Sequence, residues 1–473
     1  MVDGRALTAQ FEDAADFETR KVLCGGQLLT VLFLDGLTSG GDIAEQVVRP
    51  LAQMTDEARE EVLYTQALQG GVWCASVKEP ESTQQAAELL VNGFCVILFP
   101  KSGKALGCEV KTGEKRSPSP PETENTVKGA KDAFTETLRT NTSLVRRHLR
   151  TPGLRLAETV IGKRTLTKVT VCWIDRLTDP ELPRRMQERL SSIDIDGALS
   201  PAAIEEYVTG SRRTAFPLLE YTERTDHFCQ GLLDGQVGLL TDGLPLGYLA
   251  PVGLGRLMRS PEDRATDFFS ASMLRLLRYA ALGVSLLLPA LYAAMAMFHQ
   301  QMLPTKLLLS IIESKQNVPF STLLEVLGLL CAFELLQQAG LHLPQAVGTA
   351  VSIIGGLVVG TAAVDAKLVS PAALIVTASS GICGFTLPNR ELSDAVRLWR
   401  FVLTVLAGLW GLFGVTVGLL LLLTELAGLE SLGRSYLSPF GRAEVKGALV
   451  RPRLVRQKWR DGALKPMDDQ NQR

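Results

Sequence analysis

The chain has 473 residues, a formal net charge of −1 and a hydrophobic fraction of 46%. This length excludes a single compact domain. The eight cysteines include no CxxC pair and have no histidine nearby at ligand spacing. That pattern excludes a disulfide framework or a zinc site and predicts buried thiols in a reducing compartment.

Charged and apolar residues are segregated along the chain. Acidic and basic residues concentrate in residues 1–270, whereas residues 279–424 are mainly Leu, Ala, Gly and Val. This division predicts an α/β soluble N-terminal region followed by an all-α multi-pass membrane domain. The opening stretch MVDGRALTAQFEDAADFETR is polar and acidic and lacks the apolar core of a signal peptide. We therefore expect the soluble region to stay in the cytosol.

The soluble region repeats one pattern. Residues 31–38 (VLFLDGLT) match residues 171–178 (VCWIDRLT), and Asn92-Gly93 matches Asp234-Gly235 at nearly the same spacing. Each copy has the pattern of a strand, a helix and then two strands around a tight turn. We therefore predict two similar α/β lobes that arose by internal duplication. Chance similarity between common α/β patterns is the alternative.

No motif in the lobes indicates catalysis. Neither copy contains a glycine-rich phosphate loop, a catalytic triad pattern or an HExxH motif. We therefore expect no enzymatic activity, no cofactor and no bound metal.

A linker and a basic amphipathic helix separate the two lobes. The Pro/Ser run at 117–121 is typical of a linker. Asp132–Arg150 has apolar residues on one helical face and basic residues on the other, which predicts coupling to a neighbouring lobe or subunit. An anion or acidic-lipid site is the alternative, and nucleic acid is not expected because no aromatic residues interleave. The basic residues are Arg139, Arg146, Arg147 and Arg150.

The membrane region begins with a basic flank. Five arginines between residues 256 and 278 precede an apolar span at Tyr279–Phe298, as at a cytosolic boundary. Leu307–Ile312 is short and is predicted to lie in the interface. Residues 319–340 contain two acids, so a crossing there would place a carboxylate in hydrocarbon; a re-entrant or interfacial segment is the alternative. The candidates for cation attraction are Glu325, Glu334 and Asp365.

The next span, Ala346–Val364, is predicted to lie at the centre of an assembly. Small residues recur at every fourth position and form a smooth helical face for close packing. Apolar residues on the other faces suit a gate that opens by wetting. The packing residues are Gly348, Ser352, Gly356 and Gly360, and the candidate pore or gate residues are Val351, Ile354, Val358 and Thr361.

The number of spans depends on one segment. Leu368–Leu387 and Phe401–Thr424 are further spans, and the basic tail that follows should be cytosolic. An even number of spans is then required, so either 319–340 does not cross or the region of Leu307–Ile312 does. We favour the first, with four spans. The predicted domains are a first lobe (1–115), a linker with the basic helix (116–155), a second lobe (156–270), a membrane domain of four to six helices (271–430) and a basic cytosolic tail (431–473).

Several motifs recur in the order found in one family. PPETENTVKGAKDAFTETLRTNTSLVRRHLRTPGLR, YTERTDHFCQGLLDGQVGLLTDGLP, the membrane entry from SPEDRATDFFSASMLRLLRYAALGVSLLLPALY, VSIIGGLVVGTAAVDAKLVSP and YLSPF follow one another. Together they resemble the bacterial spore germination receptor A-subunit (GerA) family. The chain departs from the family pattern at Ala133, usually Gly, and His148, usually Arg. Gln337, Gln338 and His342 replace charged residues after Glu334, which weakens any expectation of ion pairs there.

The resemblance implies a multi-pass protein of the inner spore membrane, with the N-terminal domain and C-terminal tail on the cytosolic (spore core) side. It implies germinant receptor B and C subunits, further copies of the chain and membrane lipid as partners. It also implies an oligomeric, nutrient-gated channel for monovalent cations that initiates germination, with the nutrient pocket mainly in the B subunit. The alternatives are a non-conducting scaffold or signal-coupling subunit, an accessory protein of the dipicolinate-release machinery, and a secondary transporter.

Overall fold

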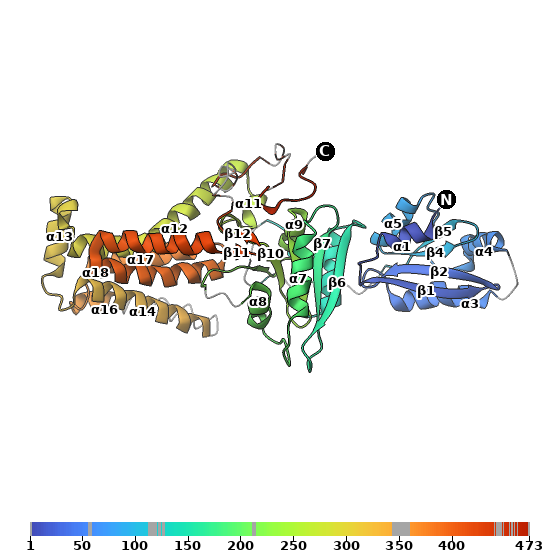
Figure 1. The fold of residues 1–473 in the computed structure, drawn as a ribbon, viewed down its shortest axis with the longest axis horizontal. Coiled ribbons are helices and arrows are strands. Elements are labelled where there is room, and N and C mark those ends of the chain that lie inside the picture. The colour runs from blue at the N-terminus through green and yellow to red at the C-terminus, as the bar shows by residue number, and fades with distance from the viewer. Residues whose placement is uncertain are drawn as a thin grey trace.

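The computed structural model describes residues 2–54, 59–111, 121, 124, 128–210, 214–342, 360–438, 440, 447, 449–453, 455, 457, 459–460 and 462–471. Figure 1 shows an elongated molecule in which two α/β lobes and a bundle of helices follow one another along the longest axis. The second lobe lies between the first lobe and the bundle, so it is the part of the chain that contacts both.

The first lobe is built on a five-stranded antiparallel sheet with the strand order β1-β2-β4-β5-β3. Apolar residues alternate along β2, so Leu29 and Val31 face one core while Leu32 and Leu34 face the other. Helices cover both faces. The elements are α1 (Gly4–Ala9), β1 (Phe17–Cys24), β2 (Gln27–Leu34), α2 (Gly40–Asp42), η1 (Ile43–Val48), α3 (Arg49–Gln53), α4 (Glu60–Gln66), η2 (Ala67–Gly71), β3 (Val77–Lys78), α5 (Thr83–Val91), β4 (Phe94–Phe99) and β5 (Lys104–Glu109).

The second lobe has the same architecture. Its sheet has the order β6-β7-β9-β10-β8, and each strand occupies the place of its first-lobe counterpart. Val31 pairs with Ile97 in the first sheet, and Val171 pairs with Leu239 in the second. The prediction of two similar α/β lobes is therefore confirmed. The elements are α6 (Leu138–His148), β6 (Leu154–Ile161), β7 (Thr167–Ile174), α7 (Glu181–Ser191), α8 (Pro201–Thr209), β8 (Glu220–Thr222), α9 (Thr225–Leu233), β9 (Val237–Thr241) and β10 (Gly247–Ala250).

The basic helix between the lobes is shorter than the predicted Asp132–Arg150. Residues before it are extended: Ala133 forms an isolated antiparallel bridge with Arg224, and Phe134 N–H donates to the carbonyl of Glu223 at 2.8 Å. Asn141 of the helix accepts from the backbone N–H of Thr135 and donates to its carbonyl, which ties the extended entry to the first turns of the helix. In the duplicated architecture α6 takes the position of α1, and it packs against α9 as α1 packs against α5.

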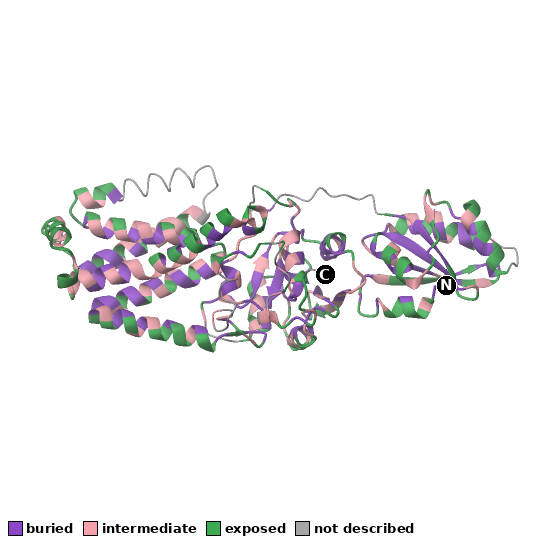
Figure 2. Ribbon diagram, turned by 90° about the horizontal axis from the view of Figure 1, so that it is seen from above, coloured by how far each residue is buried: buried purple, intermediate pink, exposed green. Residues whose placement is uncertain are grey.

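The helical bundle follows the second lobe. Three of its described helices, α12, α14 and α18, are long and apolar enough to cross a membrane. Figure 2 shows exposed residues along the outer surfaces of the bundle and buried residues on the faces where the helices meet. The elements are α10 (Leu254–Leu257), α11 (Glu262–Ala265), α12 (Phe268–Met297), η3 (Gln300–Met302), α13 (Thr305–Lys315), α14 (Thr322–His342), α16 (Gly360–Asp365), α17 (Pro371–Phe385), α18 (Arg390–Gly428), β11 (Glu430–Ser431), β12 (Arg434–Ser435) and η6 (Gly462–Leu464).

The last predicted span is a helical hairpin. Gly411 has φ 63° and ψ −142°, a conformation that breaks the helix and favours glycine. Beyond it the chain runs back along itself, because a methyl group at Gly414 would lie 2.0 Å from the carbonyl oxygen of Leu406. One at Gly418 would lie 2.4 Å from a methyl of Leu403. The expectation of one span at Phe401–Thr424 is therefore wrong, because a glycine conformation that apolarity does not reveal reverses the chain.

The segment 319–340 also differs from the favoured interpretation. It forms the continuous helix α14, which is long and apolar enough to span and packs against α17 and α18. The hairpin returns the chain toward its starting side, so the tail no longer requires this segment to be left out. After α18, Ser431 Oγ donates to the carbonyl of Leu218 at 2.6 Å, so the exit from the bundle packs on the second lobe.

Candidate functional site

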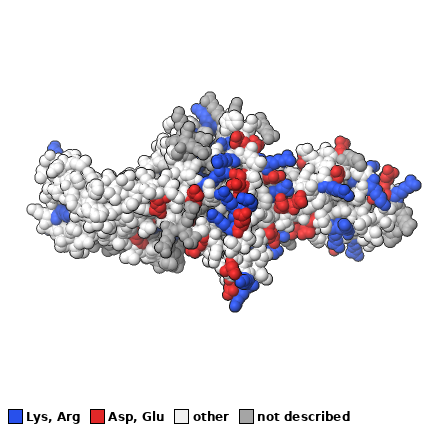
Figure 3. Space-filling model, viewed as in Figure 1, with Lys and Arg blue, Asp and Glu red and all other residues white. Residues whose placement is uncertain are grey.

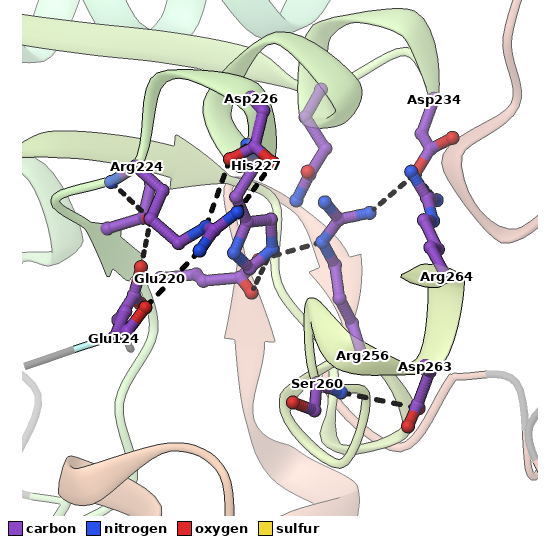
Figure 4. Close-up of polar contacts among 12 residues, drawn as sticks. Glu124, Glu220, Arg224, Asp226, His227, Asp234, Arg256, Ser260, Asp263 and Arg264 are labelled. Atoms are coloured by element: carbon purple, nitrogen blue, oxygen red, sulfur yellow. Dashed lines mark hydrogen bonds and ion pairs between the residues drawn. The ribbon is translucent and has the colours of Figure 1, made fainter. Parts of the chain in front are cut away.

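Charged groups gather where the second lobe meets the bundle. Figure 3 shows acidic and basic residues over both lobes, while the visible face of the bundle carries few. At the junction, Arg256 of α10 donates to Glu220 Oε2 at 2.7 Å and to Asp234 Oδ2 at 3.0 Å. Arg264 of α11 donates to the same Asp234 oxygen at 3.1 Å, and His227 Nε2 lies 3.2 Å from Glu220 Oε1. Figure 4 shows these side chains converging from β8, α9, α10 and α11.

Glu220 is buried, Asp234, His227 and Arg256 are half-buried, and Arg264 is exposed at the edge of the network. Burial alone would raise the pKa of Glu220, but Arg256 and His227 outweigh burial and lower that pKa to about 2. Burial also opposes ionisation of Asp234, yet Arg264 and Arg256 lower its pKa. Both carboxylates are therefore charged at neutral pH, and each binds the segment that leads into the bundle. We call Glu220, His227, Asp234, Arg256 and Arg264 the junction network.

A second set of ion pairs continues into α12. Asp263 of α11 accepts from Arg275 Nη2 at 3.0 Å and from Arg278 Nη1 at 2.7 Å. Arg275 and Asp263 are both nearly inaccessible to solvent. Four of the arginines that formed the predicted basic flank thus have carboxylate partners within the chain, at 256, 264, 275 and 278. Composition indicated the flank but not these partners, which lie up to 36 residues away.

Glu124, from the linker between the lobes, contacts the same region. Arg224 is buried and binds Asp226 through Nε at 3.0 Å and Nη2 at 2.7 Å. Its Nη1 donates to the carbonyl of Glu124 at 3.3 Å, while Thr222 Oγ1 donates to the Glu124 carboxylate at 2.5 Å. Figure 4 places this group beside the junction network. The linker motif and the motif at the start of α9 are therefore parts of one structure.

A cavity of about 850 Å³ lies between α8 and the first turns of α18. Its lining includes Glu205 and Glu206 from α8 and Glu391 and Asp394 from α18. Burial raises the pKa of Glu205. Within the described part of the chain, no group of three or more His, Cys, Asp or Glu is placed to hold a metal ion.

The four arginines predicted to couple lobes or subunits have different positions. Arg146 is buried and makes a bidentate ion pair with Asp16 of the first lobe, with two N···O distances of 2.8 Å. Arg139 Nε lies 3.0 Å from Asp35 of the same lobe. Arg147 and Arg150 are exposed, and Arg150 donates to the carbonyl of Arg147. The structure thus places Arg139 and Arg146 at the contact between the lobes.

Two of the three acids predicted to attract cations, Glu325 and Glu334, lie among other polar groups. Glu334 of α14 binds Arg397 at 2.9 Å and Arg400 at 3.1 Å, both from α18. Arg400 is fully buried and also donates to Ser380 Oγ at 3.2 Å. Despite the substitutions after Glu334, an ion-pair group is present here, and Gln337 accepts from Arg397 at 2.7 Å.

Glu325 faces a different neighbour. It is buried in the first turn of α14, where its Oε2 accepts from Ser370 Oγ at 3.0 Å. Ser370 is the N-cap of α17, so the carboxylate lies at the positive end of that helix. Asp365 is exposed at the end of α16.

Most of the predicted central span lies outside the described residues. This applies to Gly348, Val351, Ser352, Ile354, Gly356 and Val358. Of the remaining members, Gly360 is buried, and a methyl group there would lie 3.6 Å from Leu374 of α17. Thr361 is exposed on α16. The packing and gating roles stay predictions.

The structure thus combines two tandem α/β lobes with an apolar helical bundle, and ion pairs such as Arg256–Glu220 join the two parts. The family model for the Bacillus/Clostridium GerA spore germination protein matches residues 5–466. The chain therefore belongs to the GerA family, as its motifs predicted.

The chain is similar to several known proteins. The membrane protein YfkQ of Bacillus subtilis is 36% identical over 94% of this chain and 87% of its own length. Spore germination protein KA of B. subtilis is 34% identical over 93% and 81%, respectively. The crystal structure of the N-terminal domain of the A subunit of the Bacillus megaterium spore germinant receptor GerK3 aligns with 52% of this chain and 92% of that one. Its identity is 23% and its TM-score 0.42.

Proposed function

We propose that this chain is an A-type subunit of a germinant receptor in the inner spore membrane. It would act with B and C subunits, and several copies would assemble into a nutrient-gated cation channel that initiates germination. Membership of the GerA family and relatives such as spore germination protein KA support the receptor role. Three helices among the described residues are long and apolar enough to cross a membrane, and they support the membrane location.

The junction network is the observation that carries the proposal. The segment α10–α11 connects the second lobe to α12 along the chain, and ion pairs of Glu220 and Asp234 hold both helices to that lobe. Buried pairs of this kind resist independent movement, because separating them leaves uncompensated charge. Both the start of α12 and the end of α18 lie beside this lobe, which supports one cytosolic side for the lobes and tail.

Deletion in the native spore former tests the receptor role. Spores that lack the gene should lose their response to at least one amino acid or sugar in a panel, and the wild-type gene should restore it. Complementation with Arg256→Leu should restore little or no protein in the membrane and therefore no germination response. Complementation with Lys78→Ala should restore the response. Normal germination with every nutrient after deletion would instead favour a role in dipicolinate release.

A non-conducting coupling subunit is the second candidate. It is favoured by Glu334, because this acid is paired with Arg397 and Arg400 inside one copy instead of facing an open path. Val358→Ala and Val358→Asp separate the two candidates through cation leak from vegetative cells that express the assembled receptor. A channel predicts increased leak with at least one variant. If the leak is unchanged while the receptor still assembles, the predicted span that contains Val358 does not line a pore, and the coupling role is favoured.

A further inference from the structure

The first turns of α12 carry an apolar face that the described chain leaves uncovered. Phe269 is 75% exposed and Met273 is 62% exposed, and Leu276 continues the same helical face at 48%. The opposite face is buried: Ala271 packs inside, and Arg275 binds Asp263 and the carbonyl of Gly447. The start of α12 is therefore amphipathic in the reverse of the usual orientation. Its buried arginine faces the rest of the protein, and its apolar side chains face outward.

The length of α12 shows where this face lies. Its 30 residues extend about 45 Å, whereas a hydrocarbon core is about 30 Å thick. The far end of α12 is level with the hairpin turn of α18, because a methyl group at Gly411 would lie 3.0 Å from Phe298 Cβ. The hairpin arm from Arg390 to that turn is about 30 Å long. The first turns of α12 therefore extend past the arm, beside the second lobe.

The surroundings of this face favour lipid over a protein partner. Figure 1 shows the N-terminal end of α12 slanting away from α17 and α18 toward α11. The face is continuous with exposed Val284 farther along the same helix, within the part that would cross the membrane. At its edge the guanidinium of Arg453 lies over the ring of Phe268 at 5.1 Å. A cation beside an apolar stripe suits an anionic headgroup above acyl chains.

We infer that the segment Phe268–Leu277 lies in the headgroup layer of the cytosolic leaflet, with Phe269, Met273 and Leu276 among the acyl chains. The second lobe is then held directly against the membrane surface, because α11 and α12 share the Asp263 ion pairs. The inference rests on the proposed placement of the bundle in a bilayer. It adds a lipid-binding surface at the point where the junction network meets the membrane.

Photo-crosslinking in native membranes tests the inference. Phe269 or Met273 is replaced by p-benzoylphenylalanine in the full chain, and cells are grown with radiolabelled phosphate to mark phospholipids. Phe413, exposed on the second arm of α18, is the lipid-facing control, and Leu199, exposed on the second lobe, is the water-facing control. After irradiation, the variants at 269, 273 and 413 should carry labelled phospholipid, and the variant at 199 should not.

Three other outcomes would each contradict either the inference or the proposed function. A protein adduct at positions 269 and 273 would identify the face as a subunit contact and overturn the inference. No adduct at these positions, with label at 413, would place them in water and also overturn it. Absence of label at 413 would contradict the membrane placement of the hairpin, and with it the proposed function on which the inference depends.

Discussion

The two lobes share a fold but differ where the second one meets the bundle. Lys78 and Glu220 occupy equivalent positions, since Lys78 pairs with Gly107 on β5 and Glu220 pairs with Leu249 on β10. Lys78 is exposed, and its ammonium lies 5.0 Å from the Phe94 ring, whereas Glu220 is buried and binds Arg256. The same fold thus presents a solvated lysine in one copy and an ion-paired carboxylate in the other.

A second pair of equivalent positions, Asn92 and Asp234, shows the same difference between the lobes. Asn92 and Asp234 are the C-caps of α5 and α9, and each precedes a glycine with positive φ. Asn92 Nδ2 donates to the carbonyl of Glu88 in its own helix, whereas Asp234 binds Arg256 and Arg264. Turn chemistry is therefore common to the two lobes, and the charge differs where a lobe holds the segment leading to the bundle.

The largest expected effect is at the junction network. Arg256→Leu removes a partner from the buried carboxylate of Glu220 and from the half-buried carboxylate of Asp234, so we expect a loss of about 3–5 kcal/mol of unfolding free energy. Lys78→Ala in the first lobe should lower the free energy of unfolding by less than about 1 kcal/mol. Thermal unfolding of the purified full chain in detergent measures both. Similar losses for the two variants would contradict the proposed difference between the lobes.

The contact between the lobes comes next. Arg146→Leu leaves Asp16 buried without its bidentate partner, and we expect a loss of about 3 kcal/mol at this contact. The neighbouring exposed residue supplies the control, because Arg147→Leu should change stability by less than about 0.5 kcal/mol. Limited proteolysis between the lobes should be faster only in the Arg146 variant. Equal cleavage of both variants would show that this ion pair does not hold the lobes together.

Equivalent residues after β2 and β7 should respond in opposite directions. Gly36 has φ +87°, and a methyl group there would lie 2.2 Å from Ser143 Oγ of α6. Gly36→Ala should therefore destabilise the chain by about 1–3 kcal/mol. Arg176, its counterpart, has φ 60°, so Arg176→Gly should stabilise the chain by up to about 1 kcal/mol. Shifts of the same sign in the unfolding midpoint would contradict this difference.

The smallest expected effect depends on pH. His148 Nε2 lies 2.6 Å from Asp132 Oδ2, and this hydrogen bond raises the pKa of His148 and lowers that of Asp132. The histidine contribution is present below its unfolded pKa and is lost as pH rises through the raised folded value. The aspartate contribution is present above its unfolded pKa and is lost as pH falls through the lowered value. The pair therefore stabilises most between about pH 4 and 6.5.

His148→Gln tests this contact. Because the imidazole is partly exposed, we expect a loss of only a few tenths of a kcal/mol at about pH 6 and a smaller loss at about pH 8.5. Unfolding midpoints of the variant and the wild type at the two pH values measure the difference. An equal loss at the two pH values would show that the histidine acts through packing instead of charge.

Sequence patterns predicted the duplicated fold because both lobes keep their strand alternation and turn residues. Residues 31–38 and 171–178 form equivalent strand ends, and Gly93 and Gly235 close equivalent turns. The same patterns did not predict the partners of the arginines, because an ion pair such as Arg256–Glu220 depends on elements brought together by the tertiary fold. Two arginines three residues apart at 397 and 400, entering an apolar helix, were the available indication of the contact with Glu334.

Span counting failed for a related reason. Hydrophobic length identified α12 and α14 as apolar segments, but it did not reveal the reversal at Gly411. That reversal depends on one positive φ angle and on glycines at 414 and 418 that allow the two arms to approach. Small residues within an apolar run have this double meaning, since they suit both close helix packing and a change of direction.

A double-mutant cycle between Glu220 and Arg256 tests the central claim most directly. Glu220→Gln, Arg256→Gln and the double variant of the full chain are compared with the wild type by unfolding in detergent and by germination of complemented spores. We predict a coupling energy above about 1.5 kcal/mol, with loss of germination in each single variant. Additive effects within about 0.5 kcal/mol, or normal germination with either single variant, would contradict a coupling role for this ion pair.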